Sequence, residues 1–180
     1  RHQKSFADLD ANMMKTGEGA MQYCYNAQAA VSEDGIIVAT GLSTSPSDAP
    51  ELVPMVEAAR ANTGERPEVV LADAGYRSEE NFRRLRRRRQ RCVVAVGRDG
   101  KPTKWPKGRW TQRMHRLTRL PWARALYRHR KTQGERPFAE IKQRMGLRCF
   151  ALRGKPKVRG EWDLVAAALN LVTIWRAVEA

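Results

Sequence analysis

A run of four apolar residues, Val69–Ala72, leads directly into Asp73, and Gly75 ends the segment. A short apolar run bounded by turn residues predicts a buried strand. Ser78-Glu79-Glu80 follows, a pattern that is typical of a helix start. Asp73 would then lie at the carboxyl end of a strand, where open α/β sheets place their ligands and chemistry. An Asp after a strand is also a common turn former or helix cap, so the segment alone leaves both roles open.

Apolar spacing on either side predicts the remaining elements. Strands are expected at residues 21–31, 36–42 and 92–97, with a hairpin loop at 32–35, and helices at 49–62, 78–90, 123–145 and 161–178. A further strand is expected at Asp8 and Asp10. The order is strand, strand, strand, helix, strand, helix, strand. It predicts an α/β, RNase H-like mixed sheet: an antiparallel three-strand meander plus parallel strands, flanked by helices.

Length and composition favour one ordinary domain. The 180 residues are 42% hydrophobic, which is enough for a single core over residues 1–180. No apolar run approaches the roughly 20 residues that span a bilayer, so no membrane partner is expected. Residues 1–5 include neither an initiator Met nor a signal-peptide core, which indicates a fragment. Cys24, Cys92 and Cys149 lie too far apart for a zinc finger, and reduced cytosolic thiols are expected.

Charge is distributed unevenly along the chain. Residues 1–82 contain 6 Lys/Arg and 13 Asp/Glu, whereas residues 83–180 contain 28 and 6. This imbalance favours a polyanionic partner. Nucleic acid is favoured over an anionic membrane surface, because the basic residues are interleaved with Trp and Pro rather than with Leu and Phe at helical spacing. Residues 98–120 have no period and are predicted to be a basic excursion from the core. Its Lys/Arg side chains would contact phosphates and its Trp side chains would stack on bases, unless the segment is an ordinary solvated loop.

Four carboxylates could form a metal site. Phosphoryl transfer with two metal ions needs carboxylates from separate parts of a chain to converge on a pair of Mg²⁺ ions. The candidates are Asp8 or Asp10, Asp73 and Glu135. Glu135 would share a helix face with Lys131 and Lys142. That face could place a metal ligand beside cations for a DNA phosphate, or it could be a simple salt-bridge ladder.

Five sequence segments occur in an order that resembles the DDE transposases of bacterial insertion sequences, in the branch with a Tyr-Arg-Glu-Lys signature. The similarity extends from about Asp8 to Arg176. The segments are Tyr25–Val31, Leu52–Met55, Leu71–Tyr76, the spaced set Tyr127, Arg130, Glu135 and Lys142, and Leu152–Trp162.

The resemblance implies a catalytic role for three of the carboxylates. The first catalytic Asp falls on Asp8, with Asp10 as the alternative, in a segment that is usually Asp-Pro-Asp and in which Leu9 stands in place of the Pro. The second catalytic Asp is Asp73 and the catalytic Glu is Glu135. Two Mg²⁺ or Mn²⁺ ions would bind between these carboxylates.

The resemblance also implies a DNA-binding surface. Phosphates would be positioned by Tyr127, Arg130 and Lys142, with Lys131 as the alternative to Arg130. Further contacts to the DNA backbone are expected from Arg84, Arg87, Arg88, Lys104, Lys107 and Arg109.

The implied function is metal-dependent cleavage of DNA at the ends of an insertion sequence, followed by strand transfer into target DNA. The implied partners are DNA ends, target DNA and further copies of the chain, in the bacterial cytoplasm at the nucleoid. Gly134 and Arg136 flank Glu135 where the family commonly has an apolar residue and Pro, so a catalytically inactive DNA-binding remnant is the alternative. The amino-terminal DNA-binding region that is usual in the family is not expected in residues 1–180. A structural or RNA-associated basic protein, with the three carboxylates far apart, is a further alternative.

Overall fold

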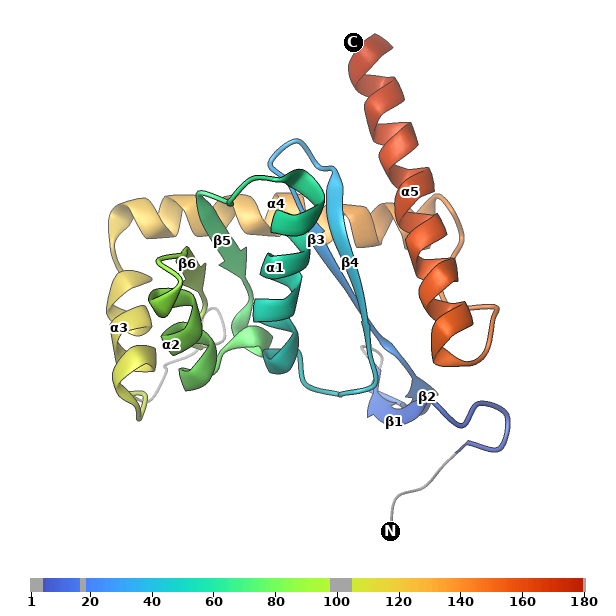
Figure 1. The fold of residues 1–180 in the computed structure, drawn as a ribbon, viewed down its shortest axis with the longest axis horizontal. Coiled ribbons are helices and arrows are strands. Elements are labelled where there is room, and N and C mark those ends of the chain that lie inside the picture. The colour runs from blue at the N-terminus through green and yellow to red at the C-terminus, as the bar shows by residue number, and fades with distance from the viewer. Residues whose placement is uncertain (1–4, 17–18, 98–104, 180) are drawn as a thin grey trace. The chain divides into compact units, whose positions relative to one another are not determined.

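The computed structural model describes residues 5–16, 19–97 and 105–179, without the side chains of residues 131 and 132. Its helices and short sheets, one of them parallel, confirm the predicted mixed α/β class (Figure 1). The chain divides into two compact units, one formed by residues 47–133 and the other by residues 1–46 with 134–180.

The unit of residues 47–133 is built around two parallel strands. β5 (Val69–Ala72) pairs with β6 (Arg91–Val94), with Val69 opposite Arg91 and Ala72 opposite Val94. The other elements are η1 (Ala49–Glu51), α1 (Leu52–Thr63), η2 (Ala74–Tyr76), α2 (Glu79–Arg87), α3 (Arg109–Leu117) and the start of α4 (Pro121–Gln143). α2 and α3 pack side by side, as Figure 1 shows.

Local sequence signals fix these elements. α2 begins at Ser78, whose Oγ accepts a 2.9 Å hydrogen bond from the backbone N–H of Asn81, as an N-cap residue should. α1 ends at Gly64 in the left-handed conformation, with φ at 73°. Leu85, Val93 and Val94 are almost completely buried in the core. The short apolar runs therefore form buried strands, and the helices that pack on them cover their side chains.

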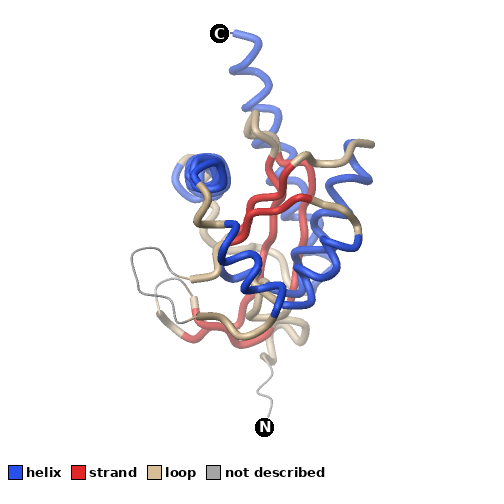
Figure 2. Tube along the Cα trace, turned by 90° about the vertical axis from the view of Figure 1, so that its left-hand side faces the viewer, coloured by secondary structure: helices blue, strands red, loops and turns tan. Residues whose placement is uncertain are grey.

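The other unit combines two hairpins with the carboxyl-terminal helix. β1 (Asn12–Lys15) pairs with β2 (Met21–Cys24), and β3 (Asn26–Val31) pairs with β4 (Ile37–Ser43), both antiparallel. α5 (Lys155–Glu179) packs on β4. Figure 2 shows the strands in red and the helices in blue.

Trp162 of α5 is the centre of this second core. It is 3% exposed, and its indole Nε1–H donates a 2.9 Å hydrogen bond to the Gln28 carbonyl of β3. Its ring stacks on Phe138 at 5.8 Å and meets Phe150 edge-on at 6.3 Å. The indole therefore satisfies its polar atom while burying its apolar surface.

Several predicted boundaries were wrong. The strand expected at residues 21–31 breaks at Tyr25, so within the described residues two separate hairpins replace the three-strand meander. The first strand is β1, and Asp8 and Asp10 lie in the loop before it. α5 begins at Lys155 instead of residue 161. Part of the 98–120 excursion is the helix α3, whose Met114 belongs to the core. In the described part of the chain, no helix is long and apolar enough to span a membrane.

Candidate functional site

Asp73 occupies the turn that leaves the parallel sheet. It follows β5 directly, with φ at −79° and ψ at −179°, and it caps η2. Its Oδ1 accepts a 2.8 Å hydrogen bond from the Gly75 N–H. The predicted position at a strand's carboxyl end is thus confirmed, and so is the capping role. The capping bond engages Oδ1 through one donor, and carboxylate oxygens carry further lone pairs.

A second carboxylate, Asp48, lies beside Asp73. An added Cβ on Gly75 would stand 2.5 Å from Asp48 Oδ2 and 3.0 Å from Asp73 Oδ1. A carbon atom cannot approach a carboxylate oxygen at 2.5 Å, so Gly75 leaves the space that these two side chains share. The pair arises from distant segments, because Asp48 precedes η1 and Asp73 follows β5.

Asn81 holds the two segments together from α2. Its side chain is 4% exposed, and its Nδ2 donates to the carbonyl of Ala49 at 2.6 Å and to the carbonyl of Tyr76 at 2.9 Å. Ala49 is the residue after Asp48, and Tyr76 ends η2. A single buried amide therefore fixes both backbone segments that carry the acidic pair.

The negative charges of the acidic pair affect the pKa of Tyr76. Burial is the main cause that raises the pKa of its phenol, and the negative charges of Asp48, Asp73 and Glu51 raise it further. The phenol therefore stays protonated at neutral pH and keeps its O–H donor near Asp48 and Asp73.

Asp8 and Asp10 accept hydrogen bonds from the backbone at the amino-terminal end of α5. Asp8 Oδ2 accepts a 3.0 Å hydrogen bond from Gly154 N–H, and Asp10 Oδ2 accepts a 2.9 Å bond from Lys155 N–H. Tyr25 also donates its O–H to Asp8, at 2.9 Å from each carboxylate oxygen. The backbone N–H groups at a helix start need acceptors, and these two carboxylates supply them.

These contacts change the acidity of Asp8. The Gly154 N–H lowers the pKa of the carboxyl group most, burial opposes this, and the bond from Tyr25 lowers it again. The same carboxylate raises the pKa of the Tyr25 phenol, after burial as the larger cause. Asp8 is therefore charged at neutral pH, as a metal ligand or a helix cap must be.

The third predicted ligand, Glu135, is exposed on α4. The guanidinium of Arg130 lies 5.1 Å from the ring centre of Tyr127, so these two signature residues contact one another. Lys142 is exposed in the last turn of α4, and the side chain of Lys131 lies outside the described residues.

Another glutamate of α4 lies among three arginines. Glu140 is within 3.0–3.6 Å of the guanidinium groups of Arg136, Arg144 and Arg176. Burial raises the pKa of Glu140, but the bonds from Arg176 and Arg136 outweigh this effect and lower it overall. All of its partners are cations, so Glu140 closes an ion-pair cluster that joins α4 to α5.

The predicted DNA contacts fall on α2 and around the start of α3. Arg84 is half-buried and Arg87 is exposed on α2, while Arg88 pairs with Glu57. Lys107 and Arg109 are exposed, and the Arg109 guanidinium lies 5.6 Å from the Trp110 ring centre. Lys104 lies outside the described residues.

The acidic pair has donors that suit a divalent cation. Carboxylate oxygens are what Mg²⁺ prefers, and Asp48 and Asp73 each bring one close to Gly75, within 2.5 and 3.0 Å of the position that a Cβ there would take. Among the described side chains, no three or more of His, Cys, Asp and Glu are gathered for a metal ion. Asp8 and Glu135 belong to the unit of residues 1–46 and 134–180, and Asp73 to the unit of residues 47–133. Their convergence stays a prediction.

Acidic residues at the end of a parallel strand, together with basic helices, define an α/β protein suited to a polyanionic substrate. The chain belongs to the transposase DDE domain family, whose model matches residues 1–171. Domains of this family carry out nucleotidyl transfer on DNA and generally depend on divalent metal ions. No curated protein and no solved structure gives a significant match.

Sequence reasoning missed Asp48 and Asn81. Asp48 stands in Ser45-Pro46-Ser47-Asp48, which is typical of a loop before a helix and contains no pattern that indicates a metal ligand. Asn81 stands in the first turn of α2, where a polar residue is ordinarily exposed. Its burial beside Phe82 follows from tertiary packing, for which the sequence contains no local signal.

Proposed function

We propose that this DDE domain cleaves DNA at the ends of an insertion sequence in the presence of Mg²⁺ or Mn²⁺ and joins the freed 3′ ends to target DNA. The observation that supports this most strongly is the acidic pair. Asp73, which the family resemblance assigns as a catalytic residue, lies beside a second carboxylate, Asp48, and oxygens of both come close to Gly75 at the end of β5.

Asp73 and Asp48 would hold the first metal ion, with Asp8, or Asp10 in its place, and Glu135 completing the set for two ions. Bound divalent ions supply charge stabilisation at the attacking and leaving oxygens of a phosphodiester. Gly75 has no side chain and so lets both carboxylates approach, and Asn81 fixes the two segments that carry them.

The basic residues would bind the DNA backbone. Arg130, Lys142 and the neighbouring Lys131 would position phosphates, with Tyr127 supporting Arg130. Positively charged side chains of α2 and the α3 region would add contacts that do not depend on sequence, namely Arg84, Arg87, Arg88, Lys104, Lys107 and Arg109. The proposal includes assembly of several copies on DNA, in the bacterial cytoplasm at the nucleoid.

Nicking of supercoiled plasmid DNA with Mg²⁺ or Mn²⁺ tests the chemistry, because it requires no knowledge of the end sequence. We expect Asp73→Asn and Asp48→Asn to lower nicking by at least about tenfold, the effect of losing roughly 1.4 kcal/mol of transition-state stabilisation. Gly75→Ala should lower it as well, because the new methyl group displaces a carboxylate. Gly160→Ala is the matched control, since nothing lies within 4 Å of its Cβ position. Nicking by Asp73→Asn at the parent rate would refute the assignment.

A DNA-binding remnant without catalysis is the second candidate. The observation in its favour is that Asp8 and Asp10 already accept hydrogen bonds from Gly154 and Lys155 at the start of α5. This candidate predicts salt-dependent DNA binding without metal-dependent nicking, and Asp8→Asn would then change stability alone.

A further inference from the structure

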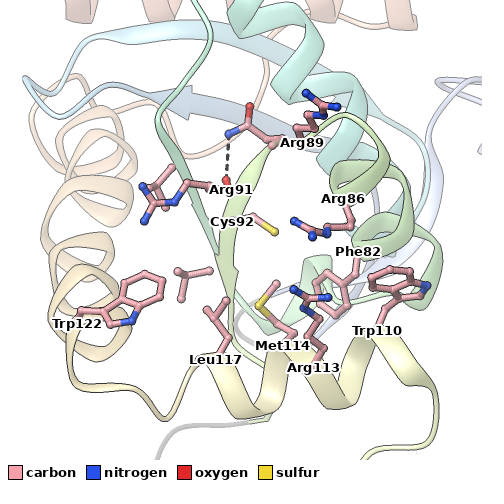
Figure 3. A pocket seen from close by; sticks show the side chains of 13 residues that line it. Phe82, Arg86, Arg89, Arg91, Cys92, Trp110, Arg113, Met114, Leu117 and Trp122 are labelled. Atoms are coloured by element: carbon pink, nitrogen blue, oxygen red, sulfur yellow. Dashed lines mark hydrogen bonds between the residues drawn. The ribbon is translucent and has the colours of Figure 1, made fainter.

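A pocket of about 150 Å³ opens at the amino-terminal ends of β5 and β6, in the unit of residues 47–133 (Figure 3). Asp73 follows the opposite, carboxyl end of β5, and a four-residue strand spans roughly 13 Å. The pocket is therefore separate from the acidic pair, and none of the proposed metal ligands lines it.

The interior of the pocket is apolar. Phe82, Met114 and Leu117 form its floor, with Trp110 on the Phe82 side and Trp122 on the Leu117 side in Figure 3. An apolar cavity of about 150 Å³ is large enough for one six-membered aromatic ring. Nucleic-acid bases stack on indoles of this kind. A guanidinium lies over one face of each ring, that of Arg91 at 5.8 Å from the Trp122 centre and that of Arg109 at 5.6 Å from the Trp110 centre, so each indole has its other face for a base.

The thiol of Cys92 lines the same interior without being reactive. Burial raises its pKa to about 11, so the group stays protonated at neutral pH. It therefore adds to the apolar lining and brings no negative charge into the pocket.

Four arginines surround this interior: Arg86, Arg89, Arg91 and Arg113. Arg91 contacts Glu68 at 3.2 Å, but both side chains are exposed, so this pair contributes little. In the described part of the chain, no carboxylate pairs with the other three. Guanidinium groups gathered without counter-charges favour a bound anion, and their planar donors suit phosphate oxygens.

Arg89 is held in a backbone conformation that favours glycine. Its φ is +55°, and it is the only non-glycine residue with positive φ among those described. It follows α2, with Arg89 N–H bonded to the Arg86 carbonyl and Gln90 N–H bonded to the Leu85 carbonyl, the pattern in which helices usually end on Gly. An arginine in that position costs stability and is explained if its charge has a use.

We propose that this pocket binds one unpaired pyrimidine nucleotide of a DNA strand, with the base between the tryptophans and the flanking phosphates on the arginines. The proposal rests on the proposed function only in taking DNA as the ligand, since binding here needs neither metal nor cleavage. A purine, with two fused rings, fills more of the 150 Å³ than the single ring of a pyrimidine does, so the smaller base is favoured, and an abasic site offers nothing to stack.

Fluorescence anisotropy with labelled ten-nucleotide strands in EDTA tests the proposal apart from catalysis. The strands are oligo-dT, oligo-dA and an abasic strand of the same charge. We expect oligo-dT to bind at least about fivefold more tightly than the abasic strand, because stacking of a base on an aromatic side chain strengthens binding by about five- to 150-fold. Trp122→Ala should remove this difference. Equal binding of oligo-dT and the abasic strand would overturn the base pocket, and equal binding of oligo-dA would overturn the pyrimidine preference.

Arg89→Gly separates binding from folding. It should weaken oligo-dT binding by about three- to tenfold and lower the slope of log affinity against log salt by about one. Its urea midpoint should be unchanged or higher, because Gly adopts positive φ without strain. Arg60→Ala on α1 removes the same charge outside the pocket and should have the smaller effect on binding. If the two variants lose the same affinity for oligo-dT, the proposed pocket is overturned. Displacement of oligo-dT by micromolar dTMP would also overturn it, because the ligand would then be a free nucleotide.

Discussion

Replacing Asn81 by Ala should damage the acidic pair without touching a carboxylate. The change removes both hydrogen bonds from the Asn81 amide, to the Ala49 carbonyl at 2.6 Å and to the Tyr76 carbonyl at 2.9 Å. The N-cap bond of α2 is retained, because it uses the backbone N–H of residue 81 and the Ser78 hydroxyl. The segments that carry Asp48 and Asp73 lose their common anchor.

The stability cost follows from the two bonds. Each net hydrogen bond contributes about 0.5–1.5 kcal/mol, and a partly buried carbonyl without a donor adds a penalty. We therefore expect Asn81→Ala to lower the free energy of unfolding by about 2–4 kcal/mol, measured by urea denaturation. The released segments should also separate the carboxylates, so plasmid nicking per folded molecule should fall.

Asn170→Ala is the matched control in the other unit. Asn170 also makes two hydrogen bonds to the backbone, accepting from Ile37 N–H and donating to Ile37 carbonyl, each at 2.8 Å. The Asn170→Ala variant should lose a similar amount of free energy of unfolding and keep its nicking activity per folded molecule. If the two variants lose the same activity after correction for the folded fraction, Asn81 has no special relation to the acidic pair and the reasoning is refuted.

Two further substitutions test the packing around each unit. Glu79 accepts hydrogen bonds of 2.7–2.8 Å from Trp110 N–H and from Thr111 N–H and Oγ–H; burial raises its pKa, but these bonds lower it overall. The charged Glu79 therefore stabilises the fold above the ordinary glutamate pKa of 4.5, and this stabilisation is lost as the pH falls through the lower pKa of the folded state. Urea denaturation measured at a series of pH values should show that Glu79→Gln weakens this loss of stability at acid pH. Trp162→Phe removes the indole donor to the buried Gln28 carbonyl and should cost about 2–4 kcal/mol in urea denaturation, whereas an unchanged midpoint would contradict the anchoring role.

Local patterns in the sequence predicted local features of the fold. The apolar run before Asp73 and the helix start at Ser78 each act within a few residues, and each is confirmed. The expected long strand breaks at Tyr25, whose hydroxyl donates to Asp8 across 17 positions, a contact that no periodicity encodes.

The acidic pair shows that local sequence patterns predict only part of the candidate site. Asp73 was found because a strand and a turn surround it, whereas Asp48 becomes notable only once Asn81 brings two segments together over 32 positions. Asp8 was identified by resemblance, and its hydrogen bond to Gly154 spans 146 positions. Partners at such separations are set by packing, which the spacing of residues along the chain does not contain.

The division into units has a consequence for synthesis on the ribosome. Residues 47–133 form one continuous unit, whereas the other unit needs residues 1–46 and 134–180 together. The continuous unit can therefore fold first, while the hairpins wait for α5. At about 5–20 residues per second, residues 134–180 take roughly 2–9 s to be made. During that interval the acidic turn can already form, and the nascent strands β3 and β4 remain without the Trp162 side chain that covers them.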